Sequence, residues 1–438
     1  MKASEIIVGL DIGTTKIACI VGRRNEHGKI EVLGHGRTES IGVRRGIVSN
    51  IEDTVNSIKK AVHEASEHSG VDIRYVNVGI AGQHIKSIQH RGSLIRESSE
   101  TAIKKAEIEK LNNDMYRLSM AAGEEIVDVI PQDYIVDGEQ GIKQPVGMLG
   151  SKLEANFHVV IGQAAAAKNI LKCVKSAGLQ MVDMILEPIA SAESVLSDEE
   201  KEAGVALVDI GGGTTDIAIF YDKILRHTAV IPFGGDVITD DIREGCNIIK
   251  KHAEEVKIKF GSAVASLNRE DEVVSIPGIR GRPAKEISFH NLANIIQARM
   301  EEIIDHIHLE IKNSGFERKL IAGIVLTGGG ALLKDISQLT AFSTGMEVRI
   351  GYPNEHLAKG TPAELASPMY ATGIGLVIEG IKRFDTELEM ERSKDDKTDE
   401  LLNNADESEK GKEEPVAEKK KTRYLDRIIR LFDREMLE

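Results

Sequence analysis

Hydrophobic residues along most of the chain fall into two alternating patterns. Short apolar runs that end near glycine, such as residues 6–10 and 205–208, have the length and β-branched composition of buried strands. Longer stretches, in which apolar residues recur every three to four positions, predict helices that bury one face. Strands and helices alternate in this way from residue 6 to about residue 384, which predicts an α/β fold.

The pattern changes after residue 384. Residues 385–421 are mostly Asp, Glu, Lys, Ser and Asn, and a segment of this composition buries too little apolar surface to fold, so we predict a disordered linker. Apolar residues return in 422–438, where a helical wheel places one set on a single face: Leu425, Ile428, Ile429, Phe432 and Met436. Four arginines repeat on the opposite face: Arg423, Arg427, Arg430 and Arg434.

A basic amphipathic helix at the end of such a tether is typical of a segment that lies in the surface of an anionic bilayer. The sequence therefore predicts a membrane-targeting helix over 422–438. The alternative is that this helix packs back on the protein body or binds a groove on a partner, because the same periodicity also marks buried faces.

An eight-residue motif near the start of the chain is repeated in a longer form further on. Asp11-Ile-Gly-Thr-Thr-Lys-Ile-Ala recurs as Asp209-Ile-Gly-Gly-Gly-Thr-Thr-Asp-Ile-Ala. Each copy lies between two apolar runs, so each is predicted to form a tight turn between two strands. The repeat implies two related lobes.

These turns carry the groups that bind a polyphosphate. Backbone N–H groups approach a phosphate closely where no Cβ intervenes, which Gly13 permits in the first turn and three glycines permit in the second: Gly211, Gly212 and Gly213. Hydroxyl donors and one cation accompany them: Thr14, Thr15, Thr214, Thr215 and Lys16. Asp11 and Asp209 head the turns and are suited to holding Mg²⁺ through water.

A third glycine cluster, Gly328, Gly329 and Gly330, also follows an apolar run and would let backbone approach a flat adenosine. Any one cluster alone is explained by a hairpin turn, but the three together predict a nucleotide site for ATP with Mg²⁺. A Walker A loop and a dinucleotide-binding fingerprint are both excluded, because neither glycine spacing follows the first strand.

Composition and charge narrow the class of protein further. The 438 residues carry a formal net charge of −14, which argues against nucleic acid as a partner. The 3 cysteines have no metal-ligand spacing and are predicted to be reduced, buried thiols. Since there is no apolar run of about 18 residues and no signal-peptide pattern, we expect a cytoplasmic protein unless another feature brings it to a membrane.

The two turns, the Gly328–Gly330 loop and the motif at residues 370–375 resemble the nucleotide signature of the actin, heat-shock chaperone and sugar-kinase superfamily. More narrowly, residues 46–53, 78–84 and 145–148 resemble the FtsA family of bacterial actin-like cell-division proteins. The resemblance implies an actin-like two-lobed ATPase fold of duplicated ribonuclease-H-like domains, with an FtsA-type inserted subdomain.

The resemblance also implies domain boundaries. The first lobe would span 1–83, 163–200 and 346–384, interrupted by the inserted small α+β subdomain at 84–162. The second lobe would span 201–345 and include a smaller subdomain at about 225–300. The linker at 385–421 and the amphipathic helix at 422–438 complete the chain.

Further site residues follow from the resemblance alone. Glu187 matches the position that faces the catalytic water and metal beside Asp209, although a solvated acid explains its local sequence equally well. Glu254 and Lys257 match a helix that contacts adenosine, with a surface salt bridge as the alternative. Arg299, on a helix at 291–304, matches the region that binds the FtsZ tail, with a solvated helical arginine as the alternative.

The function implied by the resemblance is that of an ATP-binding scaffold with at most weak ATPase activity. It would polymerise on the cytoplasmic face of the inner membrane at the division site, tether the FtsZ C-terminal peptide, and bind other division proteins through the inserted subdomain. Two alternatives stay open: a PilM-like scaffold of a membrane assembly and an actin-fold small-molecule kinase. A chaperone is excluded, since too few residues follow the nucleotide-binding part to form a peptide-binding domain.

Overall fold

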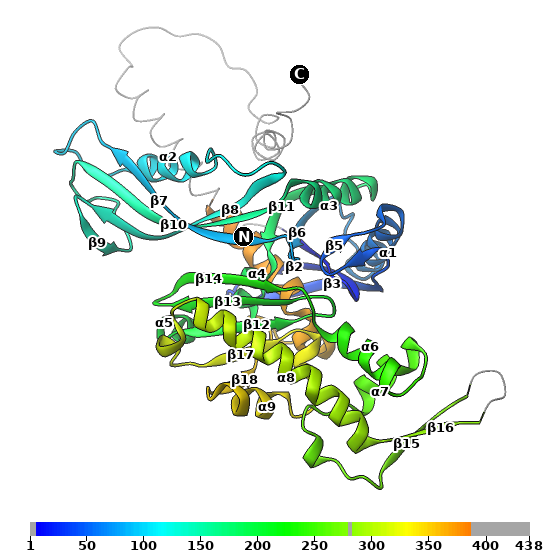
Figure 1. The fold of residues 1–438 in the computed structure, drawn as a ribbon. Coiled ribbons are helices and arrows are strands. Elements are labelled where there is room, and N and C mark those ends of the chain that lie inside the picture. The colour runs from blue at the N-terminus through cyan, green and yellow to red at the C-terminus, as the bar shows by residue number, and fades with distance from the viewer. Residues whose placement is uncertain (1–5, 279–282, 387–438) are drawn as a thin grey trace.

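The structure is a computed structural model that describes residues 6–278 and 283–386. Figure 1 shows two lobes, one above the other, and a smaller sheet that projects sideways from the first lobe. The predicted linker and terminal helix lie outside the described residues, apart from 385 and 386.

The first lobe is built on a mixed five-stranded sheet in the order β11-β6-β1-β2-β3. Its strands are β1 (Ile7–Ile12), β2 (Lys16–Arg24), β3 (Ile30–Glu39), β6 (Tyr75–Ile80) and β11 (Gln180–Leu186). One face packs against α1 (Ile51–Ser69) and α3 (Ala164–Ser176), and the other against a helix at 371–386. A short hairpin, β4 (Val43–Arg44) and β5 (Ile47–Val48), precedes α1.

The second lobe repeats this plan with the strand order β14-β13-β12-β17-β18. Its strands are β12 (Val205–Ile210), β13 (Thr215–Tyr221), β14 (Ile224–Ile231), β17 (Ile324–Thr327) and β18 (Val348–Ile350). Every residue of β12 is buried, as expected of a central strand covered on both faces. On one face lie α6 (Gly235–Gly245), α8 (Phe289–Asn313) and α9 (Ile336–Thr344), and on the other lies α4 (Glu187–Val195).

The remaining elements of the second lobe extend from this sheet. They are α5 (Asp198–Ala203), α7 (Lys250–Phe260), the hairpin β15 (Val273–Ile276) and β16 (Lys285–Ser288), and short 3₁₀ helices at Ala265–Leu267, Glu317–Lys319, Gly329–Leu332, Ala363–Ala366 and Pro368–Tyr370. The segment predicted as a smaller subdomain, about 225–300, thus includes β14 of the main sheet as well as α6, α7 and the first half of α8.

The inserted subdomain has its own sheet and core. Its antiparallel strands follow the order β7-β10-β8-β9, namely β7 (Lys86–Ile95), β8 (Glu124–Val136), β9 (Glu139–Ile142) and β10 (Lys152–Gln163), with α2 (Lys105–Met115) packed on one face. Phe157 and Leu153 lie at the centre of this core and are fully buried.

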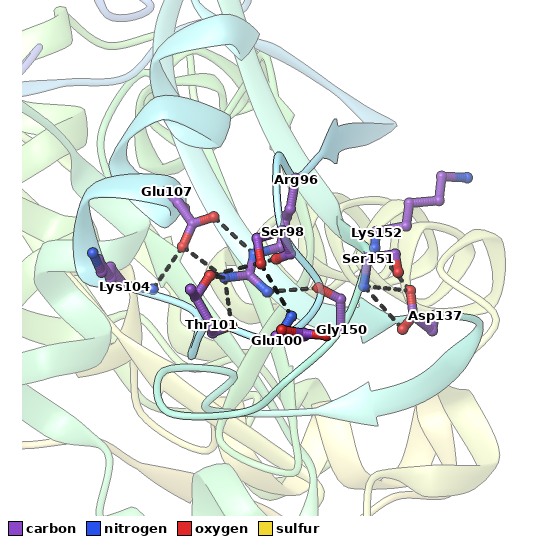
Figure 2. A network of polar contacts seen from close by, with 10 residues as sticks. All are labelled: Arg96, Ser98, Glu100, Thr101, Lys104, Glu107, Asp137, Gly150, Ser151 and Lys152. Atoms are coloured by element: carbon purple, nitrogen blue, oxygen red, sulfur yellow. Dashed lines mark hydrogen bonds and ion pairs between the residues drawn. The ribbon is translucent and has the colours of Figure 1, made fainter.

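Arg96 organises the tip of this subdomain (Figure 2). Its guanidinium donates to Glu107 Oε1 at 2.7 Å, to the Gly150 carbonyl at 2.6 Å and to the Thr101 carbonyl at 2.9 Å. Because the Arg96 side chain is almost fully buried, these bonds hold two loops and the start of α2 in one arrangement.

Candidate functional site

The two repeated motifs form the predicted strand–turn–strand hairpins, and the hairpins face each other across the lobes. The first turn joins β1 to β2, and the second joins β12 to β13. A Cβ built on Gly212 would overlap the Thr15 hydroxyl, and one built on Gly213 would overlap Thr14. The turns are therefore in contact, which means that the lobes are closed on each other.

A cavity of about 540 Å³ lies at this meeting point, lined by both turns and by the loop at Gly328–Gly330. Gly328 has φ +82°, and a Cβ there would overlap Asp209. On the second lobe the lining continues to α7 and Phe260, whose ring stacks on Phe289 with 5.4 Å between ring centroids. The cavity thus has polar groups between the turns and apolar surface at the second lobe.

Among the carboxylates that line the cavity, four lie close enough to repel one another: Asp11, Glu187, Asp209 and Asp216. Asp209 accepts hydrogen bonds from Ser191 Oγ at 2.7 Å and from Thr372 Oγ1 at 3.2 Å. These donors come from α4 and the helix at 371–386, the two segments that join the lobes.

Burial and mutual repulsion raise the pKa values of three of these four acids. Burial raises the pKa of Asp209, and burial together with repulsion from Asp209 raises the pKa of Asp216 to about 8. Burial, with repulsion from Asp11 and the other two aspartates, raises the pKa of Glu187 well above its usual range. A bound cation would relieve this repulsion.

Two of the lysines that line the cavity, Lys16 and Lys257, are already paired. Lys16 Nζ lies 2.7 Å from Asp11 Oδ2. Lys257 Nζ lies 2.7 Å from Glu254 Oε2 and donates to the Gly235 carbonyl at 2.9 Å and to Thr239 Oγ1 at 2.8 Å. Lys257 and Glu254 thus tie α7 to α6 at the cavity wall, a role beyond the surface pair that local sequence favours.

The structure brings nearly all of the predicted nucleotide-site residues to this one cavity. They are Asp11, Gly13, Thr14, Thr15, Lys16, Glu187, Asp209, Gly211, Gly212, Gly213, Thr214, Glu254, Lys257, Gly328, Gly329 and Gly330. Thr215 is a correction, because it is fully buried and its hydroxyl donates to the Phe233 carbonyl at 3.0 Å. It braces the second turn and does not line the cavity.

The predicted partner-binding residue, Arg299, lies away from the cavity. Arg299, on α8, forms hydrogen bonds to both Asp241 carboxylate oxygens, at 2.6 Å and 3.0 Å, and pairs with Glu302. An acidic ligand would therefore have to compete with these carboxylates. The predicted membrane-facing residues, from Arg423 to Met436, lie outside the described residues.

Asp216 is a site residue that the sequence reasoning missed. It lies directly opposite Asp209 in the β12–β13 hairpin, and its Oδ2 accepts from Thr214 Oγ1 at 3.1 Å. Its Oδ1 is buried and has no hydrogen-bond partner within the described part of the chain. The sequence does place an acid on each side of this turn, Asp209 and Asp216, but the strand register decides that the two lie opposite each other.

The carboxylates fit a water-bound Mg²⁺ better than a directly bound metal. Among residues 6–278 and 283–386, no three His, Cys, Asp or Glu side chains are placed to hold a metal ion directly. Mg²⁺ keeps several of its waters and takes one or two carboxylates plus phosphate oxygens. The Asp216 oxygen without a hydrogen-bond partner could accept from a water of such a cation, and the positive charge would offset the mutual repulsion of the acids.

Comparison with known proteins adds sequence relatives. The family model for "Cell division protein FtsA" matches residues 206–375, and the model for "SHS2 domain inserted in FTSA" matches residues 82–161. The chain is 40% identical over 383 residues to the cell division protein FtsA of Pseudomonas aeruginosa, covering 87% of this chain and 91% of the relative. It is 34% identical over 389 residues to FtsA of Escherichia coli, covering 87% and 92%.

Solved structures give the same fold at low sequence identity. A PilM–PilN type IV pilus biogenesis complex matches with a TM-score of 0.63 at 17% identity, covering 86% of this chain and 98% of that one. MreB 5 of Spiroplasma citri bound to AMPPNP matches with a TM-score of 0.51 at 16% identity, covering 89% and 98%. The fold is therefore actin-like, as predicted.

Proposed function

Because this chain belongs to the FtsA family of cell-division proteins, we propose that it binds ATP, polymerises on the cytoplasmic face of the inner membrane at the division site, and anchors the FtsZ ring there. The observation that carries the nucleotide part is the cavity between the two turns, where backbone N–H groups, threonine hydroxyls and carboxylates converge. MreB 5, which shares the fold, is a protein solved with AMPPNP in place.

In this proposal each part of the cavity has a role toward Mg-ATP. The two glycine turns would hold the phosphates through their backbone N–H groups. Lys16 would leave its ion pair with Asp11 and bind a phosphate oxygen instead. The loop at Gly328–Gly330 and Phe260 would face the adenosine. Asp11 and Asp209 hold the waters of Mg²⁺, with Asp216 beside them. The ion would neutralise phosphate charge.

Weak hydrolysis follows from the state of Glu187. Burial and three neighbouring acids raise the pKa of this carboxyl group and so favour its protonated form. A protonated carboxyl is a poor acceptor of the proton that an attacking water must lose. We therefore propose slow turnover, which suits a filament subunit rather than a metabolic kinase.

Membrane and FtsZ binding are proposed from the sequence and the family. The amphipathic segment 422–438 would insert its apolar face into the bilayer, and the linker would allow the body a span of roughly 30 to 36 Å from it. A single helix of this kind binds weakly, so polymerisation would add avidity. Among the described residues no helix is long and apolar enough to cross a membrane. Arg299 on α8 is proposed to contact the FtsZ tail, and the inserted subdomain to contact other division proteins.

Co-sedimentation with anionic liposomes tests the anchoring proposal. We expect the full chain to bind with ATP and to recruit FtsZ, and a chain ending at Lys421 to stay in solution. The shortened chain keeps all of the described fold, so it serves as a matched control. Equal binding by both chains would contradict the anchor and favour the PilM-like alternative.

A further inference from the structure

The inserted subdomain is attached to the first lobe, but it also docks on the second. Figure 1 shows the base of its sheet beside β14, the edge strand of the second lobe. Ser87 Oγ donates to the Thr228 carbonyl at 3.1 Å, Gln89 Nε2 to the Arg226 carbonyl at 3.1 Å, and Gln132 Nε2 to the Leu225 carbonyl at 2.5 Å. Side chains of the subdomain thus satisfy three backbone carbonyls of β14.

The centre of this contact is a buried histidine. His158, on β10, is fully buried, and its Nε2 lies 2.8 Å from Thr228 Oγ1. Gln89 Nε2 lies 3.2 Å from His158 Nδ1. Because an amide N–H can only donate, Nδ1 accepts and Nε2 carries the proton that it donates to Thr228. Burial, with a contribution from His227, lowers the pKa of His158 to about 4, which keeps this ring neutral.

An ion pair borders the contact. Arg226 Nη1, on β14, lies 2.6 Å from Asp133 Oδ2, on β8. Each of the two side chains is one-fifth exposed or less. We refer to these contacts between the inserted subdomain and β14 as the joint. Its subdomain side is Ser87, Gln89, Gln132, Asp133 and His158, and its second-lobe side is Leu225, Arg226 and Thr228.

The subdomain is connected to both turns of the nucleotide cavity, to one through β14 and to the other through the residues at its start. On the second lobe, β14 pairs with β13, where Val230 lies opposite Asp216 of the nucleotide cavity. On the first lobe, the subdomain begins after Gly82, which packs against Gly46. The Gly46 N–H donates to Thr14 Oγ1 in the first turn at 3.2 Å.

We propose that the joint couples the inserted subdomain to closure of the nucleotide cleft. The joint is formed in a structure whose two turns touch, so it stabilises the closed arrangement of the lobes. Movement of the second lobe away from the first would break the hydrogen bonds that join His158, Gln89 and Thr228 and would exchange them for bonds to water. In this proposal the subdomain thus has a docked position, which the structure contains, and an undocked position in the open state.

Coupling of this kind is reciprocal. If docking favours the closed cleft, then nucleotide favours docking by the same factor, and a partner that binds the undocked subdomain lowers nucleotide affinity. The inference rests on the proposed nucleotide binding and deepens it, because it assigns the inserted subdomain a regulatory role toward the cavity.

Stopped-flow measurement of the release of a fluorescent ATP analogue from the full chain with Mg²⁺ tests the coupling. We expect His158→Leu and Thr228→Val each to accelerate release about fivefold or more, the lower end of typical couplings. The double variant should be no faster than the faster single variant, because both changes remove the same contact. Charge reversal at Asp133→Arg or Arg226→Asp should also accelerate release, and the combined swap should restore it.

Arg96→Met is the matched control. It removes a buried polar network from the same subdomain, at the tip shown in Figure 2, without touching β14. We expect its release rate to equal that of the wild type. Hydrogen exchange gives the reciprocal test: Mg-ATP should slow amide exchange in β7 and β14 of the wild type, and His158→Leu should abolish that effect.

Wild-type release rates in the joint variants would overturn the coupling while leaving nucleotide binding intact. Equal acceleration by Arg96→Met would also overturn it, because the effect would then be general loosening of the subdomain. Failure of the wild-type chain to bind the analogue would instead refute the proposed nucleotide function, and the coupling with it.

Discussion

Contact between the two turns makes Gly212 sensitive to any added side chain. A Cβ at Gly212 would overlap Thr15 Oγ1 and lie 3.2 Å from both Thr15 Cβ and Asp236 Oδ1. Thr15 belongs to the opposite lobe, so the overlap is relieved when the lobes separate. We therefore expect Gly212→Ala to disfavour the closed state more than the open state, in which only the 3.2 Å contact with Asp236 of the same lobe remains.

The size of the effect follows from the contact. One extra methyl group in a tightly packed place costs about 1–3 kcal/mol. If this cost falls on the closed, nucleotide-bound state alone, ATP affinity should drop about 5- to 150-fold, since about 1.4 kcal/mol corresponds to a factor of ten. Equilibrium titration with a fluorescent ATP analogue and Mg²⁺ measures this directly.

Gly329→Ala is the matched control for this prediction. Gly329 lines the same cavity, but no heavy atom lies within 4 Å of a Cβ built there. We expect a smaller loss of affinity than in Gly212→Ala, because this Cβ would meet only the adenosine that the loop is proposed to face and no atom of the opposite turn. Unchanged affinity in Gly212→Ala, or an equal loss in Gly329→Ala, would refute the reasoning that closure brings the turns into contact.

Three further predictions concern single residues. Because the pKa of Asp216 is raised from 3.8 to about 8, the native state without nucleotide holds a proton that the unfolded chain has lost, so the free energy of unfolding should fall as pH rises from 3.8 to about 8. In urea unfolding, Asp216→Asn should flatten this dependence on pH, and the same variant should weaken Mg²⁺-dependent ATP binding. An unchanged dependence of the unfolding free energy on pH would contradict the prediction. Asp241→Asn should free Arg299 from its ion pair and raise the affinity for the FtsZ tail up to about fivefold, whereas Arg299→Glu should abolish binding. Fluorescence anisotropy with a labelled peptide measures both affinities, and unchanged affinity in both variants would contradict the proposed contact. Phe432→Glu should release the chain from anionic liposomes, because it places a charge among acyl chains, and retained sedimentation would rule out that orientation of the helix.

Local sequence was enough to predict the hairpin turns. Glycine and threonine between two apolar runs specify a tight turn regardless of what surrounds it, so both strand–turn–strand hairpins were predicted at the right residues. The α/β class was predicted for a similar reason, since hydrophobic periodicity reports which face of each element is buried.

Strand register was not visible in the repeated motif. The motif aligns the Thr-Thr pairs of the two copies, but the structure closes the turns at Ile12–Ile17 and Ile210–Thr215. That register turns Thr215 into the lobe and places Asp216 opposite Asp209. A register depends on hydrogen bonds along the whole strand pair, which a comparison of motif letters does not capture.

The sequence by itself thus determined the chemical groups available to a nucleotide and the turns that carry them. Tertiary structure decided which groups meet. Asp209 is held by Ser191 and Thr372, which lie on different connecting helices, and His158 meets Thr228 across two domains. Such contacts join segments distant in sequence, and they depend on how whole lobes pack, because local patterns record which face of an element is buried and not which partner covers it.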